Sequence, residues 1–111
     1  MNDMPAIIVA KGLLARWQAK GLGAVQLHKG DEDCGQILVV AEKNDGTSSL
    51  WRQVRDYHFR QVWQPVIGDG DFIDASQIHD KIASERRFDR DLWVLVLELG
   101  SAHFDPALYL E

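Results

Sequence analysis

The sequence has few of the residues that would indicate a specialised class of protein. Its 111 residues include one cysteine, Cys34, and three prolines. One cysteine cannot form an internal disulfide or supply a zinc-binding pair, so we expect a reducing compartment, the cytosol. No hydrophobic run approaches the roughly 18 residues of a membrane-spanning helix. The short apolar stretch at 6–10 lacks the length and the basic flank of a secretory signal.

Positive charge is also scarce. Twelve Lys and Arg residues against 17 Asp and Glu residues give a formal net charge of -5. This balance argues against a general polyanion binder, because nonspecific nucleic-acid affinity comes mainly from basic side chains that neutralise phosphates. The 46% hydrophobic and 26% charged content predicts a single globular domain over 1–111, with 99–111 as a tail that docks on it.

Motifs for catalysis and cofactor binding are missing from the chain. It has no phosphate-binding P-loop, no dinucleotide glycine fingerprint and no G-x-S-x-G motif. Its histidines form no H-E-x-x-H or H-x-x-x-H pair, since they are scattered at His28, His58, His79 and His103. The sequence therefore predicts no catalytic residue, no cofactor and no metal ligand.

Apolar spacing predicts two helices. Apolar residues recur every three or four positions between Ile7 and Trp17, which predicts a helix over 6–20, ended by Gly21. The β-branched residues at 7–9 leave a short initial strand open as an alternative. A second helix is predicted over 75–87.

The start of the second helix has the clearest local signal in the chain. Asp74 suits the N-cap, Gln77 suits the reciprocal position of a capping box, and Ile73 and Ile78 occupy the two hydrophobic-staple positions. The apolar stripe of this helix is too narrow for the helix to be stable alone, so we expect it to lie on a sheet.

Extended runs predict the sheet. Asp45-Gly46 is a hairpin signal between two of these runs, and alternation in the first run places His28 beside Gln26 and opposite Leu27. The region 50–67 could also form a helix, because its apolar residues fit either period. The predicted strands cover 22–29, 36–43, 48–55, 58–64 and 92–97, with a turn near 56–57. The fold class predicted is α+β, with two helices packed on one face of a mainly antiparallel sheet of about five strands in a two-layer sandwich.

Three segments together resemble a known family. They are Lys29-Gly30-Asp31-Glu32-Asp33-Cys34-Gly35, then Asp45-Gly46-Thr47, and finally the stretch from Glu85 to Val94. In order and spacing these segments resemble the small bacterial domain of unknown function family numbered 1491, over residues 10–98. The family position that corresponds to Arg90 is usually proline, and the extension 99–111 departs from the family pattern. The resemblance implies no assigned activity, catalytic residue or cofactor.

Two acidic loops are the main candidates for a metal-dependent hydrolase, which is one alternative function. Asp69, Asp71 and Asp74 could gather oxygens around a hard cation, and a second acidic loop covers 31–33. The spacing departs from an EF-hand loop, and solvated surface turns, with Asp74 used for capping, are the better explanation of both segments. Cys34 beside these acids is a poor nucleophile, because neighbouring carboxylates raise the pKa of a thiol.

Basic and aromatic residues between Trp51 and Trp63 suggest another alternative, a single-stranded nucleic-acid binder. Arg52, Arg55 and Arg60 alternate with aromatic side chains that could stack on bases. The acidic balance of the whole chain argues against this function.

The stretch 85–98 has a structural and a functional interpretation. Structurally, Asp89 and Asp91 would form turn bonds after the second helix, while Phe88, Leu92 and Trp93 would lock that helix to the sheet. Functionally, its charged residues would face a protein partner. The predicted interaction surface consists of Arg52, Arg55, Arg60, Glu85, Arg86, Asp89 and Asp91. The leading hypothesis is a non-enzymatic binding or accessory module for a protein partner or a second copy of the chain, without nucleic acid or membrane as partner.

Overall fold

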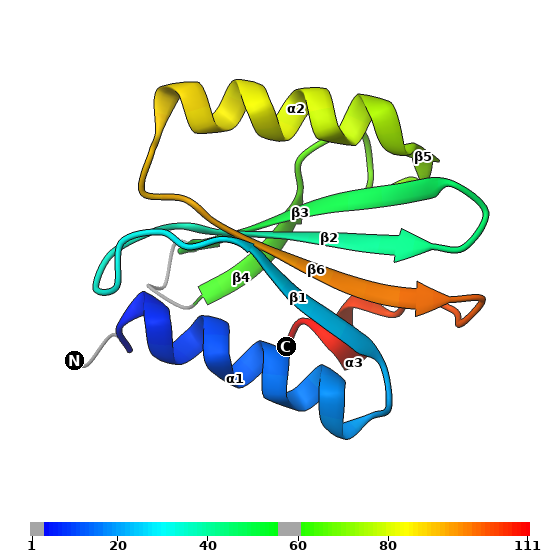
Figure 1. The fold of residues 1–111 in the computed structure, drawn as a ribbon, viewed down its shortest axis with the longest axis horizontal. Coiled ribbons are helices and arrows are strands. Elements are labelled where there is room, and N and C mark those ends of the chain that lie inside the picture. The colour runs from blue at the N-terminus through cyan, green and yellow to red at the C-terminus, as the bar shows by residue number, and fades with distance from the viewer. Residues whose placement is uncertain (1–3, 56–60) are drawn as a thin grey trace.

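A computed structural model describes residues 4–55 and 61–111, except for the side chain of Arg55. Two long helices lie on opposite sides of a central sheet (Figure 1). The helices are α1 (Ala6–Ala19), α2 (Ala75–Phe88) and the short α3 (Pro106–Tyr109). The strands are β1 (Gly23–His28), β2 (Ile37–Lys43), β3 (Thr47–Arg55), β4 (Gln61–Pro65), β5 (Ile73–Asp74) and β6 (Trp93–Gly100). The predicted α+β class is confirmed.

The sheet is mixed, and the expectation of a mainly antiparallel sheet is wrong. Its order is β1-β6-β2-β3-β4, with β5 paired to β3. The central pair, β2 and β6, runs parallel, and the other pairs run antiparallel. Strand periodicity reports which residues face a core, but it does not report which strand lies next to which. The predicted turn near 56–57 lies outside the described residues.

Both faces of the sheet are covered, so the predicted two-layer arrangement with helices on one face is also wrong. Ile37 and Val39 of β2 pack in the core under α1, while Leu38 and Val40 pack in the core under α2. Alternate residues of a strand point to opposite faces, so a strand that is apolar throughout needs cover on both sides. β2 and β6 are such strands, and this explains their central position.

The chain after β6 packs against α1. The indole Nε1 of Trp17 donates a hydrogen bond to the Tyr109 carbonyl oxygen at 2.8 Å, and Tyr109 and Leu110 are buried in the same core as Trp17. Arg16 donates to the carbonyl oxygens of Leu108 and Glu111, at 3.4 and 2.5 Å. Residues 106–111 therefore dock along α1.

The start of α2 agrees with its sequence signal at the Asp74 cap and at the Ile73 and Ile78 staple positions. The Asp74 carboxylate accepts a hydrogen bond from the Ser76 backbone N–H at 2.8 Å, and Ile73 and Ile78 lie in one hydrophobic cluster. The end of α2 differs, because Phe88 is 89% exposed and does not lock the helix to the sheet. Each residue turns a helix by about 100°, so Phe88 lies well away from the buried stripe of Ile78 and Ile82.

A β-bulge interrupts β1 near its end. Gln26 pairs with Leu95 and His28 pairs with Val94, so Leu27 is the extra residue. His28 therefore lies on the α2 side of the sheet, where Val94 also lies, and the predicted alternation that put His28 beside Gln26 is wrong. The bulge brings Leu27 and His28 together on the side of β1 that faces α2.

Candidate functional site

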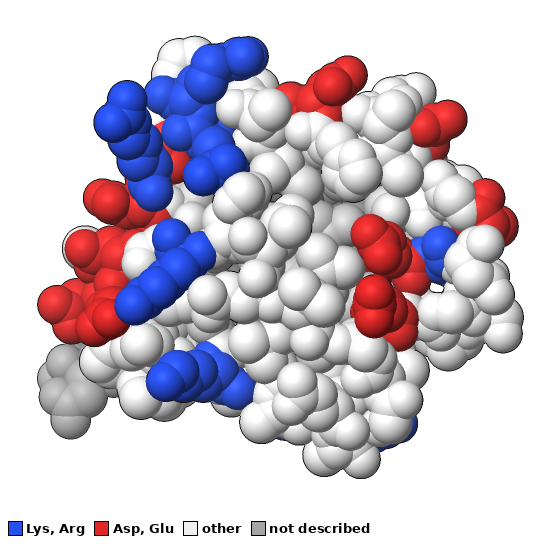
Figure 2. Space-filling view, in the orientation of Figure 1, with Lys and Arg blue, Asp and Glu red and all other residues white. Residues whose placement is uncertain are grey.

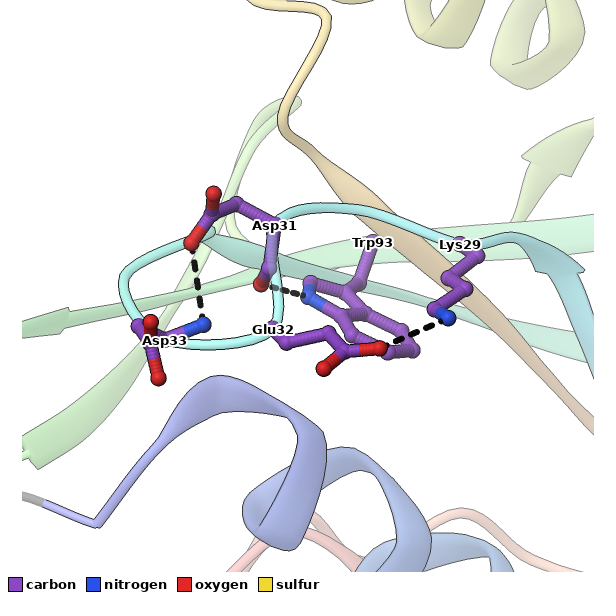
Figure 3. Close-up of polar contacts among 5 residues, drawn as sticks. All are labelled: Lys29, Asp31, Glu32, Asp33 and Trp93. Carbon is purple, nitrogen blue, oxygen red and sulfur yellow. Dashed lines mark hydrogen bonds and ion pairs between the residues drawn. The ribbon is translucent and has the colours of Figure 1, made fainter.

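The acidic loop at 31–33 is held by its own hydrogen bonds. The Asp31 carboxylate accepts from the backbone N–H groups of Asp33 and Cys34, both at 2.9 Å, and these bonds lower the pKa of Asp31. The backbone carbonyl of Asp31 accepts from the indole Nε1 of Trp93 at 2.7 Å, while Lys29 pairs with Glu32 at 2.8 Å (Figure 3). The carboxylate of Asp31 stabilises the loop, and its carbonyl ties the loop to the core.

Cys34 is exposed, and its surroundings do not activate it. The Asp31 carboxylate lies 3.4 Å from the Cys34 sulfur and accepts its S–H hydrogen bond. This bond and the negative charge of Asp31 raise the pKa of the Cys34 thiol. Little thiolate is present at neutral pH, so the sulfur is a weak nucleophile.

The acidic loop at 69–71 packs on the sheet through its backbone. Ser49 donates to the carbonyl oxygen of Gly70 at 2.9 Å, and Trp51 Nε1 donates to Ser49 Oγ at 2.8 Å. Gly70 has φ +90°, and a Cβ there would come within 2.5 Å of the Trp51 ring. The glycine allows the loop to lie flat on the indole.

The residues expected for metal chemistry are not gathered. Within 4–55 and 61–111, no three His, Cys, Asp or Glu side chains are placed to hold a metal ion. Asp74 caps α2. Among the described residues, the acidic loop at 31–33, the acidic loop at 69–71 and the Asp74 cap are three separate structural features.

The structure joins two parts of the predicted interaction surface. Arg52 on β3 and Glu85 on α2 form an ion pair, although they come from separate sequence signals. Lys81 lies 3.4 Å from the same carboxylate. The Arg52 guanidinium therefore links sheet and helix. Arg60 lies outside the described residues, and Arg55 is described only as part of the β3 backbone.

Asp89 and Asp91 lie in the turn that follows α2. The Asp89 carboxylate accepts from the Asp91 N–H at 2.9 Å, as the sequence predicts for a turn of this kind. The Asp91 backbone carbonyl accepts from the Asp31 N–H at 3.1 Å. These bonds bring the turn against the loop at 31–33.

Arg86, Arg87, Phe88 and Arg90 form a basic and aromatic projection at the end of α2, which we call the arginine corner. All four side chains are exposed, and the three arginines border an open hollow of about 470 Å³. None of these arginines has an ion-pair partner among the described residues. Figure 2 shows basic side chains gathered over this end of α2, above a group of acidic ones. Sequence reasoning singled out Arg86 but not the exposure of Phe88.

A groove between β1 and α2 was not anticipated from the sequence. It measures about 320 Å³ and shares Ala83 and Arg86 with the hollow at the arginine corner. The spacing of His79, Ala83 and Arg86 places them on one side of the helix, so the α2 wall could have been inferred from periodicity. The opposite wall depends on the bulge at Leu27, which has no comparable signal.

The fold defines a small α+β protein with a mixed sheet covered on both faces. The sequence profile of the family described as protein of unknown function (DUF1491) matches residues 4–105. The chain belongs to this family, as its motifs indicated. No match was found among curated proteins.

Solved structures support the fold. The chain is similar to a protein from A. tumefaciens solved in solution, with a TM-score of 0.78, 23% identity, and coverage of 96% of this chain and 92% of that one. A DUF1491 family protein from Caulobacter crescentus matches in its crystal structure with a TM-score of 0.77, 22% identity, and coverage of 86% and 88%. An NMR structure of a DUF1491 family protein from the same organism matches with a TM-score of 0.79 and 21% identity. The match covers 97% of this chain and 94% of that one. At this identity the likeness establishes the fold alone.

The helices give one further fact. Within the part of the chain that the structure describes, no helix is long and apolar enough to cross a membrane.

Proposed function

We propose that the protein is a non-enzymatic binding module for protein partners and that the arginine corner is its contact surface. The observation that carries this proposal is Phe88, which is 89% exposed on a well-formed helix. A phenylalanine in water loses the stabilisation that burial of its ring would give. Aromatic and arginine side chains are also the residues that contribute most to protein interfaces.

The chemistry of the corner favours an acidic protein surface with an apolar recess. Arg86, Arg87 and Arg90 would pair with carboxylates around the recess, and Phe88 would fill it. Arginine suits this role because its planar guanidinium binds a carboxylate through two hydrogen bonds.

The surroundings of the corner argue against a nucleic acid or a membrane surface. The acidic loop at 31–33 contacts the turn after α2, and the net charge is -5. A polyanion would bring phosphates close to these carboxylates, whereas a protein partner can place its acidic groups only opposite the arginines. The same acidic loop on a second copy would give a homo-oligomeric form of this contact. A cytosolic setting belongs to the proposal, because the chain has one cysteine and no disulfide.

The test is site-specific photo-crosslinking in cells that naturally produce the protein. A photoreactive phenylalanine analogue replaces Phe88, and in a matched control it replaces Leu108, an apolar side chain on α3 that is 50% exposed. We expect a defined protein adduct from position 88 only, and we expect Arg87→Glu with Arg90→Glu to abolish it. Mass spectrometry of the adduct distinguishes another protein from a second copy of this chain.

Equal adducts from both positions, or an adduct that survives both charge reversals, would contradict the proposal. An adduct to nucleic acid in place of protein would also overturn it. Circular dichroism of each variant verifies that the loss of crosslinking is not a loss of folding.

A further inference from the structure

The groove between β1 and α2 combines an apolar base with cationic and imidazole groups at its rim. Ile82 is buried beneath it, while Leu27 is 47% exposed and contributes apolar wall. His28 comes from the bulge of β1, and His79 and Arg86 come from α2. A site of about 320 Å³ lies at the small end of the range for small-molecule sites.

The bulge makes this groove. In a regular strand Leu27 and His28 would point to opposite faces, and only one of them could face α2. The extra residue turns both side chains towards the helix. Bulges often occur next to functional sites, where they redirect a side chain.

We propose that this groove binds a ligand with an apolar body and a carboxylate head. The apolar body lies over Leu27, Ile82 and Ala83. Arg86 binds the carboxylate through its guanidinium, which has no ion-pair partner among the described residues.

The charges around the groove support an anionic head. Arg87 and Arg90 border the adjoining hollow, so positive charge continues beyond Arg86. The guanidinium of Arg86 is near enough to His28 to help lower the pKa of its imidazole, after the larger effect of burial. Neutral His28 can then donate a hydrogen bond to the ligand, and a bound carboxylate would offset the field of Arg86 at the imidazole.

The test is an NMR titration of the purified chain with octanoate, with octanol as the uncharged control and octylammonium as the control of opposite charge. We expect octanoate to shift the signals of Leu27, His28, His79 and Ala83 and to raise the pKa of His28. Arg86→Gln should weaken octanoate binding about tenfold, the effect of losing one charge-assisted hydrogen bond. Ala83→Leu should abolish binding by filling the groove.

Two probes distinguish the sources of such a carboxylate. One outcome is that a hexapeptide that ends in a leucine carboxylate binds more tightly than octanoate while its C-terminal amide does not. That result would identify the ligand as a peptide C-terminus. Tighter binding of octanoate would indicate a free aliphatic acid. Any of three results would overturn the proposal. They are equal binding of octanoate, octanol and octylammonium, no change in the pKa of His28 when octanoate binds, and full octanoate binding by the Ala83→Leu variant.

The groove and the proposed protein contact share Arg86, but variants at other positions separate the two proposals. Phe88→Ser should leave octanoate binding intact, whereas Ala83→Leu should leave the crosslink from position 88 intact. Each proposal can therefore fail alone.

Discussion

Arg52 on β3 and Glu85 on α2 form an ion pair that joins the sheet to the helix above it. Their side chains are only 29% and 21% exposed, and the Arg52 Nε is buried without a hydrogen-bond partner among the described atoms. The guanidinium therefore depends on Glu85 for compensation of its charge.

Removing that compensation should lower the free energy of unfolding. We expect Glu85→Gln to cost about 1–2 kcal/mol in urea unfolding, because it leaves a partly buried cation without its partner. Lys81→Gln is the matched control and should cost about 0.5 kcal/mol or less, as for an exposed pair on one helix. The double variant Arg52→Met, Glu85→Leu should recover part of the loss. If Glu85→Gln and Lys81→Gln lower the free energy of unfolding by the same small amount, the ion pair between Arg52 and Glu85 contributes no more than a pair on the protein surface.

Trp93 is the second position at which a single change should have a large effect. Its ring is buried, and its Nε1 donates to the Asp31 carbonyl at 2.7 Å. We expect Trp93→Ala to cost about 3 kcal/mol or more through the cavity it leaves. Trp93→Phe keeps part of the ring and loses the hydrogen bond, so it should cost less. A loss below about 1 kcal/mol for Trp93→Ala in urea unfolding would contradict the burial of this side chain.

Cys34 should react slowly with alkylating reagents near neutral pH. The Asp31 carboxylate raises the pKa of the thiol above its ordinary value of 9.0, and the thiolate is the reactive form. Asp31→Asn removes the negative charge and should increase the rate of iodoacetamide labelling measured at pH 8. The thiol pKa from a labelling profile against pH should fall in the variant. An unchanged profile would show that the Asp31 contact to sulfur does not persist in solution.

His28 should make folding stability depend on pH between about 5.5 and 7.5. Burial, and then the charge of Arg86, lower the pKa of His28 from its ordinary value of 6.5. The unfolded chain therefore binds the proton more readily, and stability falls as pH drops through 6.5 towards the lower folded value. Asp31, Asp45 and Asp74 do not titrate in this window, because hydrogen bonds lower the pKa of each below 3.8.

Arg86→Gln tests this pH dependence. The variant should raise the pKa of His28 in an NMR titration and reduce the loss of stability between pH 7.5 and 5.5. Arg90→Gln is the control at the same corner. Equal effects of the two changes would show that Arg86 has no special proximity to His28.

Much of the local structure could be predicted from sequence because its causes are local. The Asp74 cap, the Asp45-Gly46 turn with Gly46 at φ +84°, and the helix over Ala6–Ala19 all follow from neighbouring residues. The continuous apolar run in β2 requires cover on both faces, and the prediction of both helices on one face conflicts with it. That error came from treating the helices as one layer.

The candidate site was only partly predictable, because its determinants are not local. The contact between Arg52 and Glu85 depends on how α2 crosses the sheet, and the groove depends on a bulge at Leu27. Phe88 was assigned to the core because aromatic residues usually lie there. The predicted helix ends at residue 87, but α2 continues through Phe88, and there the helical angle from Ile78 and Ile82 turns the ring away from the core.

The parallel pairing of β2 with β6 also has a consequence for how the chain folds. β6 lies between β1 and β2, so about fifty residues that follow β2 must be synthesised before the middle of the sheet can form. Until then β1 has no neighbour, and the edge of β2 that will bind β6 is open. Folding should therefore be slow for a chain of this length and should end with the insertion of one strand. A nascent chain that stops before Trp93 would leave β1 unpaired and one edge of β2 open, and exposed strand edges of this kind promote aggregation.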